Sequence, residues 1–364
     1  MAVLFITRKY PPQTGGMESF SYGLINHYKG EKHVIALKKS QINLIWFYPY
    51  ALLKAIGVIW TKKIDLVHLS DGVMTPLGHI LKIICGRPVV FTAHGLDINF
   101  NHFLYRKLMP LFFRQMTHIF CVSNATRLEC IKTGVNETKI SIIPNAVEPR
   151  EWPQNLSKNE ARERLSQNFN CRDVKIVLSV GRLARRKGFR WFIENVMTKL
   201  PEEYIYLIIG AGRETKGFFA QPVSQNDLLE QAVRTYRLTD RVHFLGKVLP
   251  QALIDAYAAA DIFVMPNIII KGDMEGFGIV ALEAGMMGTP VLAANIEGIR
   301  DAVIDGTTGL LAESQNAEDF IAKLALLEKL NLSPQDIRAT VIEKFSWEKI
   351  SKRYKDAFEK LQCK

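Results

Sequence analysis

Two successive series of short apolar, β-branched runs constrain the fold of this 364-residue chain more than any other feature. Helix-length segments separate the runs, and parallel strands need such crossover connections. Each series therefore predicts a doubly wound, Rossmann-like parallel α/β sheet, and two series predict two such domains. The expected strands are 3–7, 33–36, 66–69, 89–92, 118–122 and 139–143 in the first series, and 176–180, 204–209, 242–245, 262–265 and 291–293 in the second.

A polar stretch between the two series marks the domain boundary. Residues 148–170 contain two prolines and many charged side chains. We therefore predict an N-terminal domain over 1–150, a linker over 151–171 and a C-terminal domain over 172–346. The tail has an apolar stripe at helical spacing, so a terminal helix over 347–364 is expected to pack back on the first domain. The stripe consists of Trp347, Ile350, Tyr354 and Phe358.

The cysteines and the N-terminus indicate a cytoplasmic protein. The five cysteines are scattered, odd in number and without close Cys-Cys or Cys-His spacing, which favours reduced thiols and argues against a zinc site. The apolar run at the N-terminus is followed by Arg8 and Lys9 instead of being preceded by basic residues. It is therefore expected to be a buried first strand and not a signal peptide.

Nearly all the positive charge lies in the first domain. Residues 1–150 contain 18 Lys and Arg against 8 Asp and Glu, whereas residues 151–364 contain 29 against 28. A basic half beside a neutral half predicts a polyanionic partner, either nucleic acid or an anionic membrane; a merely solvated basic surface is the alternative. Because no helix-turn-helix, zinc-finger or RNA-recognition signature is visible, we expect no nucleic-acid partner and a peripheral location at the inner face of the cytoplasmic membrane.

Two aromatic-rich segments bear on the membrane interpretation. Segment 44–60 is interrupted by Pro49 and Lys54, so it does not predict a confident transmembrane helix. Its aromatic residues and flanking lysines fit an interfacial segment, and segment 104–114 has the same mixture. An ordinary buried helix is an equally good interpretation of each segment.

Two glutamates, Glu275 and Glu283, flank a Gly-Phe-Gly turn and the start of an apolar helix. The turn and helix start place free backbone N–H groups between the two carboxylates, which is a natural anion site. Carboxylates suit sugar hydroxyls and the amides suit phosphate, so the segment predicts a site for a sugar attached to a phosphate. Asp273 next to Glu275 does not supply enough oxygen ligands for a metal, so we expect no metal.

Other candidates follow predicted strands, where open α/β sheets bind their ligands. Arg182 and Lys187 bracket a basic loop suited to a diphosphate, although a solvated basic loop is the alternative. His94 could contact a sugar or phosphate or act as an acid or base, whereas a lone histidine is often structural. The glycines permit close approach of a phosphate or nucleotide, or simply form turns; they are Gly15, Gly16, Gly210 and Gly212.

The ordered set of these motifs resembles the family-4 retaining glycosyltransferases of GT-B fold, in which two Rossmann-like domains face each other across a cleft. The resemblance covers essentially the whole chain. It includes Gly15-Gly16, His94, Pro144-Asn145, Val180-Gly181-Arg182, Lys187-Gly188, Gly210-Ala211-Gly212, the Glu275 and Glu283 pair, Gly306-Thr307-Thr308-Gly309 and Phe345-Ser346-Trp347.

The resemblance implies a role for each candidate. Catalysis is assigned to His94, Arg182, Lys187 and Glu275. Arg182 and Lys187 would hold the diphosphate, Glu275 would contact the donor sugar, and His94 would contact the sugar or the phosphate. Glu283 would hold the ribose hydroxyls. The remaining donor or nucleotide contacts would be made by Gly15, Gly16, Gly210, Gly212, Arg213, Gly246, Lys247, Val248, Gly276, Phe277, Gly278 and Ile279.

The resemblance further implies a metal-independent enzyme with no cofactor besides its nucleotide-diphosphate sugar. We expect it to move a hexose, with retained anomeric configuration, from a UDP- or GDP-sugar to a glycan or lipid-linked acceptor in cell-envelope or lipopolysaccharide biosynthesis. Two carboxylates flanking an anomeric carbon are not evident, which favours same-face attack. The alternatives are a nucleotide-sugar epimerase of the same fold and a non-catalytic polyanion- or membrane-binding protein that retains a nucleotide site.

Overall fold

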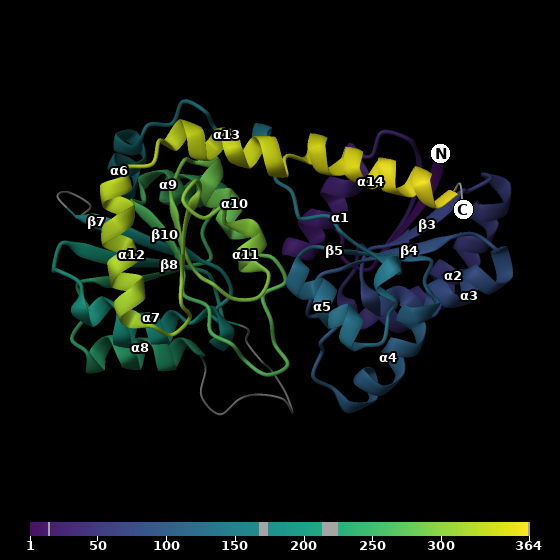
Figure 1. The fold of residues 1–364 in the computed structure, drawn as a ribbon, viewed down its shortest axis with the longest axis horizontal. Coiled ribbons are helices and arrows are strands. Elements are labelled where there is room, and N and C mark those ends of the chain that lie inside the picture. The colour runs from purple at the N-terminus through teal and green to yellow at the C-terminus, as the bar shows by residue number, and fades with distance from the viewer. Residues whose placement is uncertain (14, 167–173, 213–224, 363–364) are drawn as a thin grey trace. The chain divides into compact units, whose positions relative to one another are not determined.

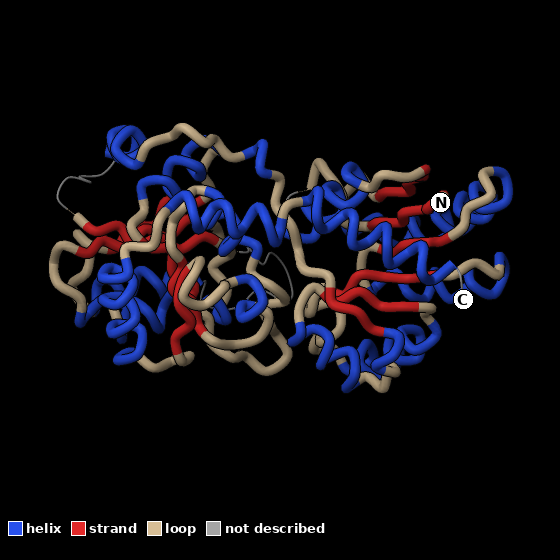
Figure 2. The backbone as a smooth tube through the Cα atoms, turned by 45° about the horizontal axis from the view of Figure 1, so that its top comes forward, coloured by secondary structure: helices blue, strands red, loops and turns tan. Residues whose placement is uncertain are grey.

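The computed structural model describes residues 1–13, 15–166, 174–212 and 225–362. They form two compact units, each with a six-stranded parallel sheet (Figures 1 and 2). Unit 1 comprises residues 1–148, 272–277 and 345–364, and unit 2 comprises residues 149–271 and 278–344. The predicted fold class, two doubly wound α/β sheets, is confirmed. The sequence did not predict that residues 272–277 belong to unit 1.

The sheet of unit 1 has the strand order β2-β1-β3-β4-β5-β6. The order reverses direction at β1, so the carboxyl ends of β1, β3 and β4 form the edge where such sheets bind ligands. The strands are β1 (Ala2–Thr7), β2 (Glu31–Ala36), β3 (Leu66–Leu69), β4 (Val89–Ala93), β5 (His118–Cys121) and β6 (Ile140–Ile142), and the helices are α1 (Gly16–His27), α2 (Leu44–Thr61), α3 (Thr75–Cys85), α4 (Phe103–Gln115), α5 (Asn124–Lys132) and α14 (Trp347–Gln362).

Helices cover both faces of this sheet, because alternate side chains of each fully buried strand point to opposite faces. Leu4 and Ile6 of β1 belong to one core cluster, which includes residues of α2, α3 and α4. Val3 and Phe5 belong to the other, which includes residues of α1 and α14. The apolar stripe of the tail lies entirely in this second cluster, so α14 is part of unit 1.

The sheet of unit 2 has the order β12-β11-β10-β7-β8-β9. Its strands are β7 (Lys175–Val180), β8 (Tyr204–Ile209), β9 (Val242–Gly246), β10 (Ile262–Met265), β11 (Val291–Ala294) and β12 (Gly309–Ala312). Its helices are α6 (Lys158–Ser166), α7 (Phe189–Asn195), α8 (Gln225–Thr235), α9 (Pro250–Ala259), α10 (Ile279–Met286), α11 (Ile299–Ala302), α12 (Ala317–Leu330) and α13 (Pro334–Phe345).

The sequence placed eleven of these strands within two residues of their ends, and it missed β12. That strand has four residues, begins with a glycine and follows a turn, so it carries too little strand signal to be noticed. It forms at the sheet edge because residues 291–294 of β11 provide its parallel partner. A side chain at Gly309 would place its Cβ 1.9 Å from the Val291 carbonyl oxygen, so the close pairing requires glycine.

Candidate functional site

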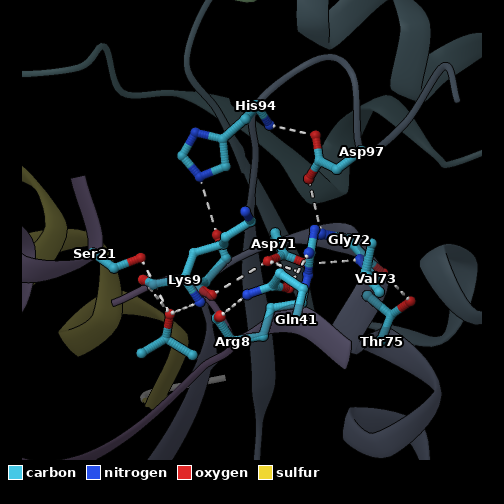
Figure 3. Close-up of polar contacts among 12 residues, drawn as sticks. Arg8, Lys9, Ser21, Gln41, Asp71, Gly72, Val73, Thr75, His94 and Asp97 are labelled. Atoms are coloured by element: carbon cyan, nitrogen blue, oxygen red, sulfur yellow. Dashed lines mark hydrogen bonds and ion pairs between the residues drawn. The ribbon is translucent and has the colours of Figure 1, made fainter. Parts of the chain in front are cut away.

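In unit 1, the candidate site is built around His94, which directly follows β4 (Figure 3). The ring Nε2 lies 3.0 Å from the Ser70 carbonyl oxygen, and the ring makes an edge contact with Phe20. Because a carbonyl only accepts, Nε2 carries the hydrogen and Nδ1 is the acceptor of the neutral ring. The neutral histidine can therefore accept a hydrogen bond or a proton through Nδ1, and its predicted contact with a sugar or phosphate stays a prediction.

Asp97 fixes the backbone beneath His94. Its two carboxylate oxygens accept from the backbone N–H of His94 and of Gly72, each at 2.8 Å (Figure 3). The side chain is buried, and burial raises the pKa of its carboxyl while the two N–H donors oppose that rise. Asp97 thus ties the loop after β4 to the turn after β3, which are neighbouring strands.

A second carboxylate, Asp71, connects β3 to β1. It is completely buried and its Oδ2 lies 3.0 Å from Nε of Arg8, which directly follows β1. Burial alone would lower the pKa of the Arg8 guanidinium, but the pairing with Asp71 raises it overall. Gln41 completes the arrangement by accepting from Arg8 at 2.9 Å (Figure 3). The carboxyl ends of three strands are therefore held in one polar network behind His94.

Residues 272–277 pack directly on the loop that carries His94. A side chain at Gly276 would place its Cβ 1.8 Å from the His94 carbonyl oxygen, so only glycine permits this approach. The Gly276 carbonyl oxygen accepts from the Thr126 hydroxyl at 3.5 Å. Glu275, which is partly exposed, is consequently held in unit 1 with His94, while Glu283 belongs to unit 2. The two glutamates that are close in sequence thus stand in different compact units.

The glycines at the start of α1 face a carboxylate. Gly15 precedes the helix, and a Cβ there would lie 2.6 Å from Glu18 Oε2. Glu18 is buried and accepts from Lys9 at 2.9 Å. The predicted phosphate approach at Gly15 and Gly16 would therefore meet a negative charge that the sequence reasoning overlooked, and it stays a prediction.

In unit 2, the candidate site lies at the carboxyl end of β7. The one-turn helix 185–187 buries Lys187, whose Cε would lie 3.1 Å from a Cβ at Gly181. Lys187 lies near enough to Glu283 for its charge to lower the pKa of that carboxyl. Arg182 and Arg185 on the same loop are exposed. Lys187 and Glu283 are therefore electrostatically coupled within unit 2.

Tyr257 of α9 holds Glu283 in place. The tyrosine hydroxyl donates to Glu283 Oε2 at 2.7 Å, and the ring is completely buried. Protein atoms surround the Glu283 carboxylate although part of the residue stays exposed, and this burial raises its pKa while Tyr257 and Lys187 lower it. Burial also raises the pKa of the Tyr257 hydroxyl, so the tyrosine remains a donor at neutral pH.

The loops predicted to contact the nucleotide follow β8 and β9, and the structure describes most of the residues predicted to make that contact. A Cβ at Gly210 would lie 1.8 Å from the Gly181 carbonyl oxygen, and one at Gly212 would lie 2.6 Å from Asn226 Oδ1. Backbone packing therefore accounts for Gly210 without a ligand, whereas the neighbour of Gly212 is the end of an exposed side chain that can move aside. The residues that follow β9 begin with Gly246 at its end, continue with exposed Lys247 and end with partly exposed Val248. Arg213 lies outside the described residues.

The helix α10 begins directly after the Gly-Phe-Gly turn. Its N-cap is Gly278 in the left-handed region at φ 91°, and among the described residues no side chain caps the helix. Phe277 is buried, whereas Ile279 is partly exposed at the first helical position. The helix start offers backbone N–H groups on the same eight-residue helix that carries Glu283, as the sequence predicted.

Sequence reasoning missed Asp97, Asp71, Arg8 and Tyr257. Asp97 lies three positions after His94, and a carboxylate so close after a buried strand is the one local signal that could have found it. Tyr257 lies in an alanine-rich helix and has no such signal. Taken together, the buried ammonium of Lys187, the carboxylate of Glu283 and the backbone N–H groups at the start of α10 suit hydroxyl and phosphate groups.

The chain matches glycosyltransferases over both halves. The family described as glycosyl transferases group 1 matches residues 161–344, and glycosyltransferase family 4 matches residues 2–151. An uncharacterized glycosyltransferase of Methanocaldococcus jannaschii is 25% identical, with 99% of each chain covered. The UDP-Gal:alpha-D-GlcNAc-diphosphoundecaprenol alpha-1,3-galactosyltransferase of Escherichia coli is 27% identical over 89% of this chain and 80% of that protein.

The fold matches solved structures equally well. Anabaena HepE in complex with UDP-glucose superposes with a TM-score of 0.78 at 18% identity, covering 99% of this chain and all of that one. At this identity the likeness establishes the fold, and the family matches establish the relationship. The chain therefore belongs to the group 1 glycosyl transferases, with an N-terminal half of family 4, and is a glycosyltransferase of GT-B fold.

Proposed function

We propose that this glycosyltransferase moves a hexose from a nucleotide-diphosphate sugar, UDP in preference to GDP, to a glycan or lipid-linked acceptor in cell-envelope polysaccharide biosynthesis. The preference for UDP rests on the names of similar proteins: the Escherichia coli relative uses UDP-Gal, and HepE was solved with UDP-glucose. The lipid-linked acceptor rests on the diphosphoundecaprenol in the name of the same Escherichia coli relative.

One observation carries the donor proposal: Lys187 is buried against Gly181 just after β7, and its charge reaches Glu283 of α10, where it lowers the pKa of the carboxyl. The ammonium of Lys187 would contact the diphosphate, and Glu283 would accept hydrogen bonds from the ribose hydroxyls. Tyr257 keeps the carboxylate oriented and favours its ionised form. A carboxylate binds a diol and repels phosphate, whereas an ammonium attracts phosphate. Glu283 therefore suits the ribose and Lys187 suits the diphosphate.

The proposed mechanism retains the anomeric configuration. As the bond from C1 to the diphosphate stretches, negative charge grows on the leaving group and is stabilised by Lys187, Arg182 and the start of α10. The leaving phosphate takes the proton of the acceptor hydroxyl, which attacks on the same face. His94 accepts from a donor hydroxyl, and fixed cations take the place of a metal. Trapping a covalent glycosyl-enzyme, or losing transfer in EDTA, would contradict this scheme.

A thermal-shift panel of UDP-, GDP- and ADP-sugars tests the donor proposal. A ligand present at 100 times its Kd stabilises the folded state by about 2.7 kcal/mol. With all three sugars at the same concentration, the one with the preferred base has the lowest Kd and should give the largest increase in Tm. We expect Lys187→Ala to lose most of the shift given by the diphosphate. The matched control is Arg185→Ala, which removes an exposed cation two positions away in the same turn. A wild-type response of Lys187→Ala would show that the donor site is elsewhere.

A further inference from the structure

Helices α2, α3 and α4 present an exposed apolar surface on one side of unit 1. Contacts join α2 to α3 and α3 to α4, so the three helices lie side by side in one layer over the sheet. Their outer residues, here called the α2–α4 face, include six large apolar side chains that are each at least 69% exposed. They are Ile45, Trp46, Leu53, Trp60, Ile83 and Phe103. Scattered exposed apolar residues are normal on a soluble protein, but several large ones gathered on neighbouring helices mark a surface that meets a partner or a membrane.

The structure shows which side of segment 44–60 is buried, a question that the sequence left open. One side of α2 is buried against the sheet at every fourth position, through Phe47, Ala51, Ala55 and Ile59. Among the described residues, 41–61 is the one helical stretch long and apolar enough to cross a membrane, yet only 22% of its window is buried. Because its inner side belongs to the core of unit 1, the helix can meet a bilayer with its outer side while lying flat.

The charge of this layer is of one sign. The three helices contain no Asp or Glu, and their five cationic residues are Lys54, Lys82, Arg106, Lys107 and Arg114. The loops that follow α2 and α3 add exposed Lys62, Lys63 and Arg87. On the opposite side of the same sheet, α14 mixes three acidic with five basic residues, and α1 and α14 together expose one large apolar side chain, Tyr22. The α2–α4 face thus combines exposed apolar side chains with helices whose charges are all positive, and the one acidic residue of the two following loops, Asp65, accepts from the backbone N–H of Ala2.

A pocket lies between the ends of α2 and α3. Its volume is about 330 Å³, and it is lined by Ile59, Trp60, Lys63, Ile84, Cys85 and Arg87. Two cations beside a tryptophan and two isoleucines suit a group that is anionic at one end and apolar at the other. Tryptophan prefers the headgroup level of a bilayer, and lysine and arginine bind lipid phosphates there.

We propose that the α2–α4 face docks on an anionic phospholipid bilayer, with its apolar side chains inserted at the headgroup boundary and its cations at the level of the lipid phosphates. A second copy of this chain fits the face poorly, because pairing two uniformly cationic layers brings like charges together. The proposal goes beyond donor binding and does not depend on it. It places the glycosyltransferase where a lipid-linked acceptor would be found.

Vesicle co-sedimentation of the full chain tests this proposal. We expect binding to vesicles that contain phosphatidylglycerol, weaker binding to pure phosphatidylcholine, and weakening as salt rises. The double variant W46S/L53S should bind roughly tenfold less, because it removes two inserted apolar side chains. Its control is L249S/I269S, which removes two exposed apolar residues of unit 2. Reversing the charge with K54E/K107E should weaken the salt-sensitive part of the binding, whereas K349E/K352E on α14 should not.

Three outcomes would overturn the proposal. These are no binding to phosphatidylglycerol vesicles at low salt, equal binding by W46S/L53S and its control, or a dimer in solution that W46S/L53S dissociates. Brominated lipids should quench the fluorescence of the wild type more than that of W46F or W60F, as insertion of these two residues requires. The UDP-sugar thermal shift of W46S/L53S should equal that of the wild type, so a failure here is distinguishable from a failure of the donor proposal.

Discussion

Replacing Tyr257 by phenylalanine tests whether the buried Glu283 is held as a carboxylate. The hydroxyl of this fully buried tyrosine donates to Glu283 Oε2 at 2.7 Å, and the change removes only that oxygen. A hydrogen bond to a charged group contributes about 1.5–3 kcal/mol to stability, whereas one between neutral groups contributes about 0.5–1.5 kcal/mol. The loss should therefore be about 1 kcal/mol larger when Glu283 is ionised than when it is protonated.

The sign of the pH dependence follows from the pKa of Glu283. Burial raises that pKa in the folded state, so the contribution of the group to stability is complete below its unfolded pKa and is lost as pH rises through its folded pKa. The Tyr257 hydrogen bond opposes the rise, so Tyr257→Phe should raise the folded pKa further. The destabilisation should consequently grow as pH rises through the folded-state pKa of Glu283.

Urea denaturation at a series of pH values measures this effect, and the chain provides a matched control. Tyr206 is also fully buried, and its hydroxyl donates to the neutral Ser179 Oγ at 2.8 Å. Tyr206→Phe removes the same atom without touching a charge, so its cost of about 0.5–1.5 kcal/mol should not vary with pH. If Tyr257→Phe has the same pH-independent cost as Tyr206→Phe, Glu283 is not an ionised partner of Tyr257 and the reasoning fails.

Two further predictions concern the support of His94. Gly276→Ala should cost roughly 2 kcal/mol or more, because its Cβ would lie 1.8 Å from the His94 carbonyl oxygen; chemical denaturation measures the loss, and Gly57→Ala, in open space on α2, should not destabilise. Asp97→Asn turns one acceptor of a buried N–H into a donor, so it should cost about 1–3 kcal/mol and lower transfer activity. Unchanged stability and kcat in Asp97→Asn would remove Asp97 as the support of this loop.

The sequence was most informative where the local residue pattern matches the way the segment packs in the folded chain. The buried strands are continuous β-branched runs, so their places and the two-sheet architecture could be predicted, and the position of Lys187 after β7 followed from the rule for open α/β sheets. The glycines were harder to interpret. Gly210 and Gly276 exist because another backbone carbonyl lies within 2 Å of where a Cβ would be, and such an approach joins residues far apart in sequence.

The sequence alone thus determined the fold class and the family, because periodicity and ordered motifs are properties of the linear chain, and it predicted the residues of the donor site. Only the tertiary structure decided which residues act together. It separated Glu275 from Glu283, placed Glu275 beside the His94 loop, and gave Glu283 the partners Tyr257 and Lys187. It also decided which side of α2 faces outward, because that depends on how the helix packs against a sheet whose strands come from distant parts of the chain.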